Sequence, residues 1–187
     1  QDLHVDATRD LREIGCVVPV VDSIKSLAKF KGTEGVVFST YQMLVSRGSS
    51  GSGGKTRYEE LVAWLVGGRD TAQNRQRFDG CSVFDEAHKA KNYFEGKNKA
   101  GDAKASTKVG QFVTRIQEDL PNARVVYASA TGISSIENVG YLSRMGVWGP
   151  GTAFPLGLSE FVTTIGTKST GALEMLALDF KQTGCLV

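Results

Sequence analysis

Short runs of apolar, β-branched residues alternate along the chain with segments in which apolar residues recur every three or four positions. The first pattern is typical of strands and the second of amphipathic helices, so their alternation predicts an α/β fold with a mostly parallel sheet flanked by helices. Pro19 weakens the first strand, because proline cannot donate a ladder hydrogen bond. The expected strands are Val17–Val21, Val36–Thr40, Ser82–Asp85 and Val125–Ser129.

Helical segments are expected between and after these strands. Capping residues mark several of their starts, and glycine or proline marks their ends. The pattern shows no internal repeat. The expected helices are Asp6–Ile14, Val109–Leu120, a segment from Ser134 to Met145, and Ala172–Lys181.

The run GSSGSGGKT, residues 48–56, ends in the Gly-Lys-Thr of phosphate-binding loops. Such a loop needs G-x-x-x-x-G-K-[ST] directly after a strand, so that backbone N–H groups form an anion cradle at a helix N-terminus. The register fails, because Ser49 occupies the place of the first glycine and Gln42–Arg47 intervene after the strand. Thr56 and Glu59 instead predict a capping box for an amphipathic helix, preceded by a flexible connection.

Composition excludes several classes of protein. The chain has 187 residues, 41% of them hydrophobic, which is typical of one soluble globular domain. A net charge of +2 gives no global field of the kind that nucleic-acid binders carry, so any such contact must be local. The three cysteines form no CxxC pair, which argues against a zinc site or a disulfide framework, and no run is long enough to span a membrane.

Candidate chemistry begins with FDGCSVFDEAHKAKN, residues 78–92. Asp85 and Glu86 follow the apolar strand Cys81–Phe84, and the carboxyl ends of strands are where open α/β sheets bind ligands. An acidic pair there suits a magnesium nucleotide: Asp85 would hold Mg²⁺, through water, and Glu86 would orient and deprotonate an attacking water. His88 is close enough to link this site to a neighbouring element. A solvated turn is the alternative for a lone Asp-Glu pair.

A second strand end carries hydroxyl groups. ARVVYASATG, residues 123–132, ends in Ser129, Ala130 and Thr131. On its own this pattern favours a turn or a helix cap. Polar groups at two strand ends together argue against coincidence.

The tetrad DEAH followed by SAT resembles motifs II and III of the superfamily-two helicases and translocases, and GVVFSTYQML resembles their motif Ib. Five segments, QDLHVDATRDLREIG, STYQMLVS, FDEAHKAKN, ARVVYASATG and GYLSRMGVWGPGTAFP, are together similar to the strawberry notch family of DExH-type ATPases. This resemblance extends from Gln1 to about Lys181 and implies a RecA-like P-loop NTPase lobe. It implies that Asp85 is the Mg²⁺ residue, Glu86 the catalytic base for ATP hydrolysis and His88 a sensor of the phosphate.

The resemblance also implies coupling and partners. Ser129 and Thr131, with Ala130 between them, would couple hydrolysis to motion, and Thr40 and Tyr41 would lie near a DNA or RNA backbone. Further partners would be a second RecA-like lobe, chromatin and transcription factors. The location would be nuclear, or cytoplasmic in a prokaryote or phage.

Family members carry a Walker A loop upstream of the segment resembling Gln1–Gly15, and a second lobe with an arginine finger downstream. Residues 1–187 are therefore expected to be part of lobe one, with 148–187 an extension toward the second lobe. This chain alone is not expected to hydrolyse ATP, because phosphate positioning and charge stabilisation supply nearly all of the catalysis.

Other interpretations stay open. A metal-dependent hydrolase could use Asp85, Glu86 and His88, although the chain has only two histidines. A degenerate α/β module could bind partners without turnover. Trp64 and Trp148 are expected to pack, and Cys81 to lie in the core. A solvated loop is favoured over a phosphate contact for the lysines after the tetrad, which are Lys89, Lys91, Lys97, Lys99, Lys104 and Lys108.

Overall fold

The computed structural model describes residues 3–30, 32, 34–47, 54–93, 106–130, 136–166 and 170–182. The chain divides into two compact units. The N-terminal unit comprises Gln1–Asp79 with Leu120–Asn122, and the C-terminal unit comprises Gly80–Asp119 with Ala123–Val187. Each unit contains one pair of parallel strands among its described residues.

In the N-terminal unit the strands β1 and β2 pair in parallel, with Val20 opposite Val36 and Val21 opposite Val37. Both are shorter than predicted, and β1 begins directly after Pro19, whose carbonyl accepts the Val36 N–H at 2.9 Å. The elements are α1 (Leu3–Glu13), β1 (Val20–Val21), the 3₁₀ helix η1 (Ile24–Lys29), β2 (Val36–Val37), α2 (Tyr41–Leu44), α3 (Arg57–Leu65) and α4 (Ala72–Arg77).

Helix α3 contributes to the apolar core of this unit. Tyr58 and Val62 are 1% and 0% exposed, and the helix packs against η1. The predicted capping box is confirmed, because the Glu59 N–H donates to Thr56 Oγ1 at 3.3 Å and the Thr56 N–H donates to Glu59 Oε2 at 2.7 Å. Trp64 packs edge-on against Phe30, as expected of a packing residue. Residues 48–53 of the Gly/Ser run lie outside the described part of the chain.

Helix α1 differs from its prediction at its start. It begins at Leu3, so Asp6 lies inside the first turns and not at the start of the helix, where the sequence places it. The Asp6 carboxylate instead accepts a hydrogen bond from Arg9 at 3.2 Å, one turn along the helix. The helix ends before Gly15, which adopts a positive φ of 79°, as the sequence indicated.

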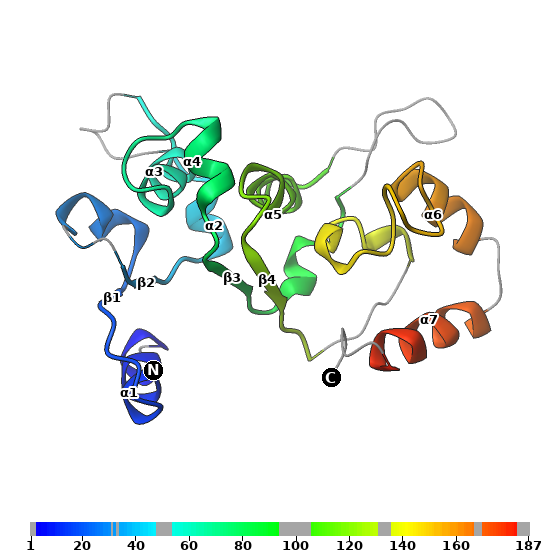
Figure 1. Cartoon of the computed structure of the whole chain (residues 1–187), viewed down its shortest axis with the longest axis horizontal. Coiled ribbons are helices and arrows are strands. Elements are labelled where there is room, and N and C mark those ends of the chain that lie inside the picture. The colour runs from blue at the N-terminus through cyan, green and yellow to red at the C-terminus, as the bar shows by residue number, and fades with distance from the viewer. Residues whose placement is uncertain are drawn as a thin grey trace. The chain divides into compact units, whose positions relative to one another are not determined.

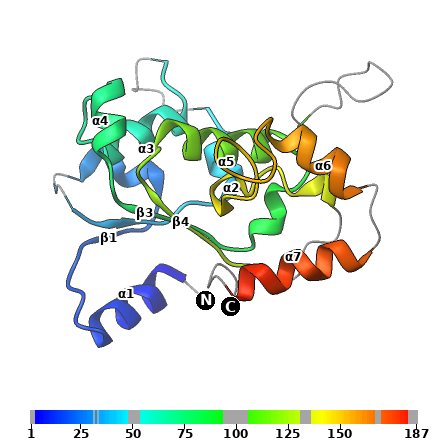
Figure 2. The same cartoon turned by 45° about the vertical axis from the view of Figure 1, so that its right-hand side comes forward.

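In the C-terminal unit β3 and β4 pair in parallel, from Cys81 opposite Arg124 to Phe84 opposite Tyr127. Helix α5 lies beside this pair in both views (Figures 1 and 2). The Phe84 and Tyr127 rings stack at 5.9 Å between centroids. The elements are β3 (Cys81–Phe84), the 3₁₀ helix η2 (Ala87–Ala90), α5 (Lys108–Asp119), β4 (Arg124–Tyr127), the 3₁₀ helices η3 (Ile136–Asn138) and η4 (Ser143–Met145), α6 (Leu158–Gly166) and α7 (Thr170–Gln182).

The other face of the β3–β4 pair is exposed, which corrects the expectation that Cys81 lies in the core. Val83 and Val126 are 63% and 47% exposed, so the strands are not buried on both faces. Cys81 shares the face of Val83, because side chains alternate along a strand, and it is exposed rather than in the core.

The predicted helix ending at Met145 is replaced by η3 and η4, and Ser134 lies outside the described residues. Gly140 interrupts this segment at a point of close packing, where a Cβ atom would lie 2.9 Å from the Leu158 side chain and from Tyr93. Gly146 ends η4 with φ 71°, as predicted. Helix α7 confirms the last predicted helix. Trp148 packs against Phe161 at 5.4 Å between ring centroids, as expected of a packing residue.

The observed elements are those of an α/β protein with parallel strands. Over the residues placed by the structure, no helix is both long enough and apolar enough to cross a membrane.

Candidate functional site

The carboxyl ends of β3 and β4 lie side by side. The ladder continues beyond the strands, because the Ala128 N–H donates to the Phe84 carbonyl and the Ala87 N–H donates to the Ala128 carbonyl, both at 2.9 Å. These two bonds bring the DEAH tetrad and Ser129 to the same edge of the strand pair. Parallel pairing of the two predicted strands produces this juxtaposition.

Asp85 and Glu86 form a tight turn at this edge. The Asp85 side chain is exposed, and its Oδ1 accepts the Glu86 N–H at 2.9 Å. Glu86 adopts a left-handed backbone, with φ 49° and ψ 47°. A residue with a Cβ atom loses about 1–2 kcal/mol in this conformation, and such strain clusters at functional sites. The turn therefore holds the Glu86 carboxylate at an energetic cost.

His88 connects the acidic pair to the second strand end. Its Nδ1 lies 3.0 Å from Ser129 Oγ and 3.2 Å from Glu86 Oε2. Glu86 Oε2 is itself buried and has no well-aligned hydrogen bond among the described residues, so the contact with His88 is an ion-pair distance rather than a directed bond. The arrangement joins Glu86, His88 and Ser129 in one polar cluster.

Helix α5 fixes the position of η2, which carries His88. Ala87 and Ala90 are 1% and 0% exposed and let η2 pack closely against α5. Gly110 permits this approach, because a Cβ atom there would lie 3.0 Å from the Ala90 carbonyl oxygen. Small residues thus allow α5 to pack closely against the backbone of the tetrad.

The remaining predicted residues are placed differently. Ala130 is exposed beside Ser129, and Thr131 lies outside the described residues. Thr40 and Tyr41 belong to the N-terminal unit, where Thr40 N-caps α2 by accepting the Met43 N–H at 3.2 Å. The cluster of the C-terminal unit is built without them.

Sequence reasoning missed a buried polar group on α5, the helix that packs against η2. Gln117 is 2% exposed and lies on α5, and its amide is hydrogen-bonded to Tyr127 of β4. The available signal was a polar residue four positions after Val113, on the apolar stripe of the predicted helix. Spacing alone does not reveal its partners.

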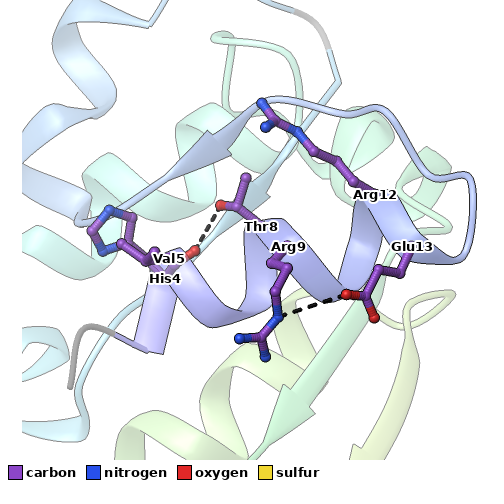
Figure 3. A pocket seen from close by; sticks show the side chains of 6 residues that line it. All are labelled: His4, Val5, Thr8, Arg9, Arg12 and Glu13. Carbon is purple, nitrogen blue, oxygen red and sulfur yellow. Dashed lines mark hydrogen bonds and ion pairs between the residues drawn. The ribbon is translucent and has the colours of Figure 1, made fainter.

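A surface hollow beside α1 is a different feature (Figure 3). Its lining comes from one helix only, and one of its two arginines, Arg9, is surrounded by carboxylates of Asp10 at 2.7 Å, Asp6 at 3.2 Å and Glu13 at 3.8 Å. The hydrogen bonds that the Arg9 guanidinium donates to the Asp10 carboxylate, together with the negative charges of Asp10 and Asp6, raise the pKa of Arg9. These carboxylates disfavour a bound anion. The lining residues are His4, Val5, Thr8, Arg9, Arg12 and Glu13.

Metal ligation was also a candidate function. Within the described ranges, no group of at least three His, Cys, Asp or Glu side chains is placed to hold a metal ion.

Comparison with known proteins identifies the class. The family model described as "P-loop containing NTP hydrolase pore-1" matches residues 1–187. The parallel strands, with polar groups at their carboxyl ends, are those of an α/β P-loop NTPase of the RecA-like kind.

Relatives among characterised proteins narrow the class to a family. The chain is 41% identical over 194 residues to "Protein strawberry notch homolog 1" of Homo sapiens and 38% identical over 198 residues to "Protein strawberry notch" of Drosophila melanogaster. It is 39% identical over 193 residues to "Protein FORGETTER 1" of Arabidopsis thaliana. Each match covers 100% of this chain. The chain belongs to the strawberry notch family.

The chain spans only 13%, 11% and 14% of the lengths of these three relatives. No solved structure is significantly similar to it.

Proposed function

We propose that the carboxyl ends of β3 and β4 form the hydrolysis site of a nucleic-acid-dependent ATPase with a helicase-like motor. The observation that carries this proposal is the cluster in which His88 contacts both Glu86 and Ser129. It joins the acidic pair to the second strand end, as a site that links hydrolysis to movement requires. Membership of a P-loop NTP hydrolase family supports the nucleotide as substrate.

Asp85 is the residue that would hold Mg²⁺. Its carboxylate is exposed and at the strand end, and carboxylate oxygen with retained water is the ligand set that Mg²⁺ prefers. This one exposed carboxylate fits an ion that keeps most of its water ligands. When bound, Mg²⁺ would neutralise charge on the phosphate oxygens of ATP.

Glu86 is proposed as the general base. Its left-handed backbone turns the side chain into the cluster, and its buried Oε2 faces His88 at 3.2 Å. A carboxylate in this position can orient and deprotonate a water molecule. His88 would link Glu86 to Ser129 through its contacts with both residues. Ser129 with Thr131 would couple hydrolysis to motion.

The partners and the location extend the same proposal. Thr40 and Tyr41 would contact a DNA or RNA backbone, and a second RecA-like lobe would complete the motor in the full-length protein. Remodelling of nucleic acid or chromatin in transcription regulation, in the nucleus, would be the outcome. The support for these points is the family likeness.

The test uses the full-length protein, because this chain spans a small part of its relatives. Hydrolysis of ATP and of a simple phosphomonoester is measured with and without DNA or RNA. The proposal predicts that ATP is hydrolysed, that the phosphomonoester is not, and that nucleic acid increases the rate of ATP hydrolysis. Hydrolysis of the phosphomonoester would favour a metal-dependent hydrolase, and no turnover of either compound would favour a binding module.

A further inference from the structure

Gln117 uses its whole hydrogen-bonding capacity in the interior of the C-terminal unit. An amide side chain has two N–H donors and two acceptor positions. Nε2 donates to the carbonyls of Val113 and Tyr141 at 2.8 and 2.9 Å. Oε1 accepts from Ser143 Oγ at 2.9 Å and from the Tyr127 hydroxyl. Carbonyl oxygens can only accept, so the nitrogen must face Val113 and Tyr141, and the orientation of the amide is fixed.

Tyr127 connects this network to the end of β4, two residues before Ser129. Its ring stacks on Phe84 and meets Tyr141 edge-on, with centroids 5.9 and 6.2 Å apart. Burial raises the pKa of Tyr127 to about 12, so its hydroxyl remains protonated and donates to Gln117 even near pH 10, where an exposed tyrosine ionises. Two residues further along, Ser129 contacts His88.

Arg144 fastens the downstream segment to the same elements. Its backbone N–H donates to the Tyr127 hydroxyl at 3.2 Å. Its guanidinium donates to the carbonyls of Ala123 at 3.0 Å and Gln117 at 3.3 Å. Together with the bonds of Tyr141 and Ser143 to the amide, these contacts attach the segment around η4 to both β4 and α5.

We propose that Gln117 is a positioning residue for the hydrolysis site: by holding Tyr127 it fixes the end of β4, and with it the contact of Ser129 with His88. This inference rests on the proposed function. Because the same amide holds Tyr141 and Ser143, a shift of the β4 end during hydrolysis reaches the segment around η4. A fully satisfied buried network of this kind has discrete arrangements rather than a continuous range, which suits a coupling element.

The first test measures kcat and KM for ATP in the full-length protein carrying Tyr127→Phe. This change removes one hydroxyl and leaves the stacked ring in place. The expected result is a loss in kcat of about tenfold or more, because displacement of groups near a reacting centre is costly, with KM nearly unchanged. Gln117→Met should act in the same direction, and Tyr127→Phe carries the test if the Met variant does not fold.

Thr114→Val is the matched control. Thr114 lies on the same helix, is 4% exposed, and its hydroxyl has no hydrogen-bond partner among the described residues. Removing that hydroxyl perturbs the core of α5 without touching the network. Its kcat should equal that of the wild type.

A double-mutant cycle distinguishes positioning from mere stability. If Tyr127 acts through Ser129, Tyr127→Phe should slow the Ser129→Ala protein hardly further, whereas independent effects would multiply. Multiplied losses, or an unchanged kcat in Tyr127→Phe, would overturn the inference. Glu86→Gln serves as the reference. If Glu86→Gln abolishes turnover while Tyr127→Phe leaves kcat unchanged, only this inference falls. If Glu86→Gln leaves turnover intact, the proposed function falls as well.

Discussion

The left-handed backbone of Glu86 predicts that this residue can be replaced with a gain in stability. A side chain with a Cβ atom loses about 1–2 kcal/mol in that conformation, whereas glycine does not. Glycine also loses about 0.5–1 kcal/mol through the greater freedom of the unfolded chain. Glu86→Gly should therefore be more stable than Glu86→Gln by about 0.5–1 kcal/mol.

Glu86→Gln is the appropriate reference, because both variants remove the Glu86 carboxylate that lies 3.2 Å from His88 Nδ1. This contact is worth little to stability, since the side chains of His88 and Glu86 are 35% and 43% exposed. For a chain of this length the expected difference in melting temperature is about 1–4 °C, measured by circular dichroism on the 187-residue chain. A lower melting temperature in Glu86→Gly than in Glu86→Gln would refute the reasoning, since it would mean that the turn carries no strain.

Three further predictions concern other parts of the chain. Thr56→Ala should lower the free energy of unfolding by about 1 kcal/mol, because it removes the capping box. Lys55→Ala should leave the nucleotide affinity of the full-length protein unchanged. A large loss of affinity in Lys55→Ala would restore the phosphate-loop interpretation. Burial raises the pKa of Tyr127 from 10.0 to about 12, so the folded state favours the neutral phenol. The contribution of the neutral phenol to stability is complete below pH 10 and is lost as the pH rises toward 12. Tyr127→Phe should lessen that loss when unfolding is measured at alkaline pH. Lys89, Lys91 and Lys108 are exposed. If they contact phosphates, changing all three to Gln should reduce the slope of log binding constant against log salt concentration for DNA by about 0.9 per lysine. An unchanged slope would mean that these lysines are solvated.

The sequence was informative about elements and less so about their limits. The apolar runs located all the strands found among the described residues, because β-branched periodicity is a local property. Their shortness and the exposure of Cys81 depend on which faces other elements cover, and that is decided by tertiary packing. The expected helix ending at Met145 failed for the same reason, since Gly140 lies in close contact with Leu158.

The sequence predicted which residues meet at the candidate site, but it did not predict the left-handed backbone of Glu86. Two parallel strands ending in polar residues must bring those residues to one edge, so the proximity of His88 and Ser129 followed from the strand pattern. The network around Gln117 arises from contacts between residues of different elements. No local sequence pattern predicts such contacts.

The central claim is that Glu86 is the base of an ATP hydrolysis site, and single-turnover hydrolysis of ATP by the full-length Glu86→Gln protein tests it most directly. Glu118→Gln is the matched control, because Glu118 is an exposed glutamate on α5. The account predicts that Glu86→Gln lowers the rate by about 10²–10⁴-fold, the usual contribution of a general base, while Glu118→Gln leaves it unchanged. Hydrolysis at the wild-type rate by Glu86→Gln would contradict the account.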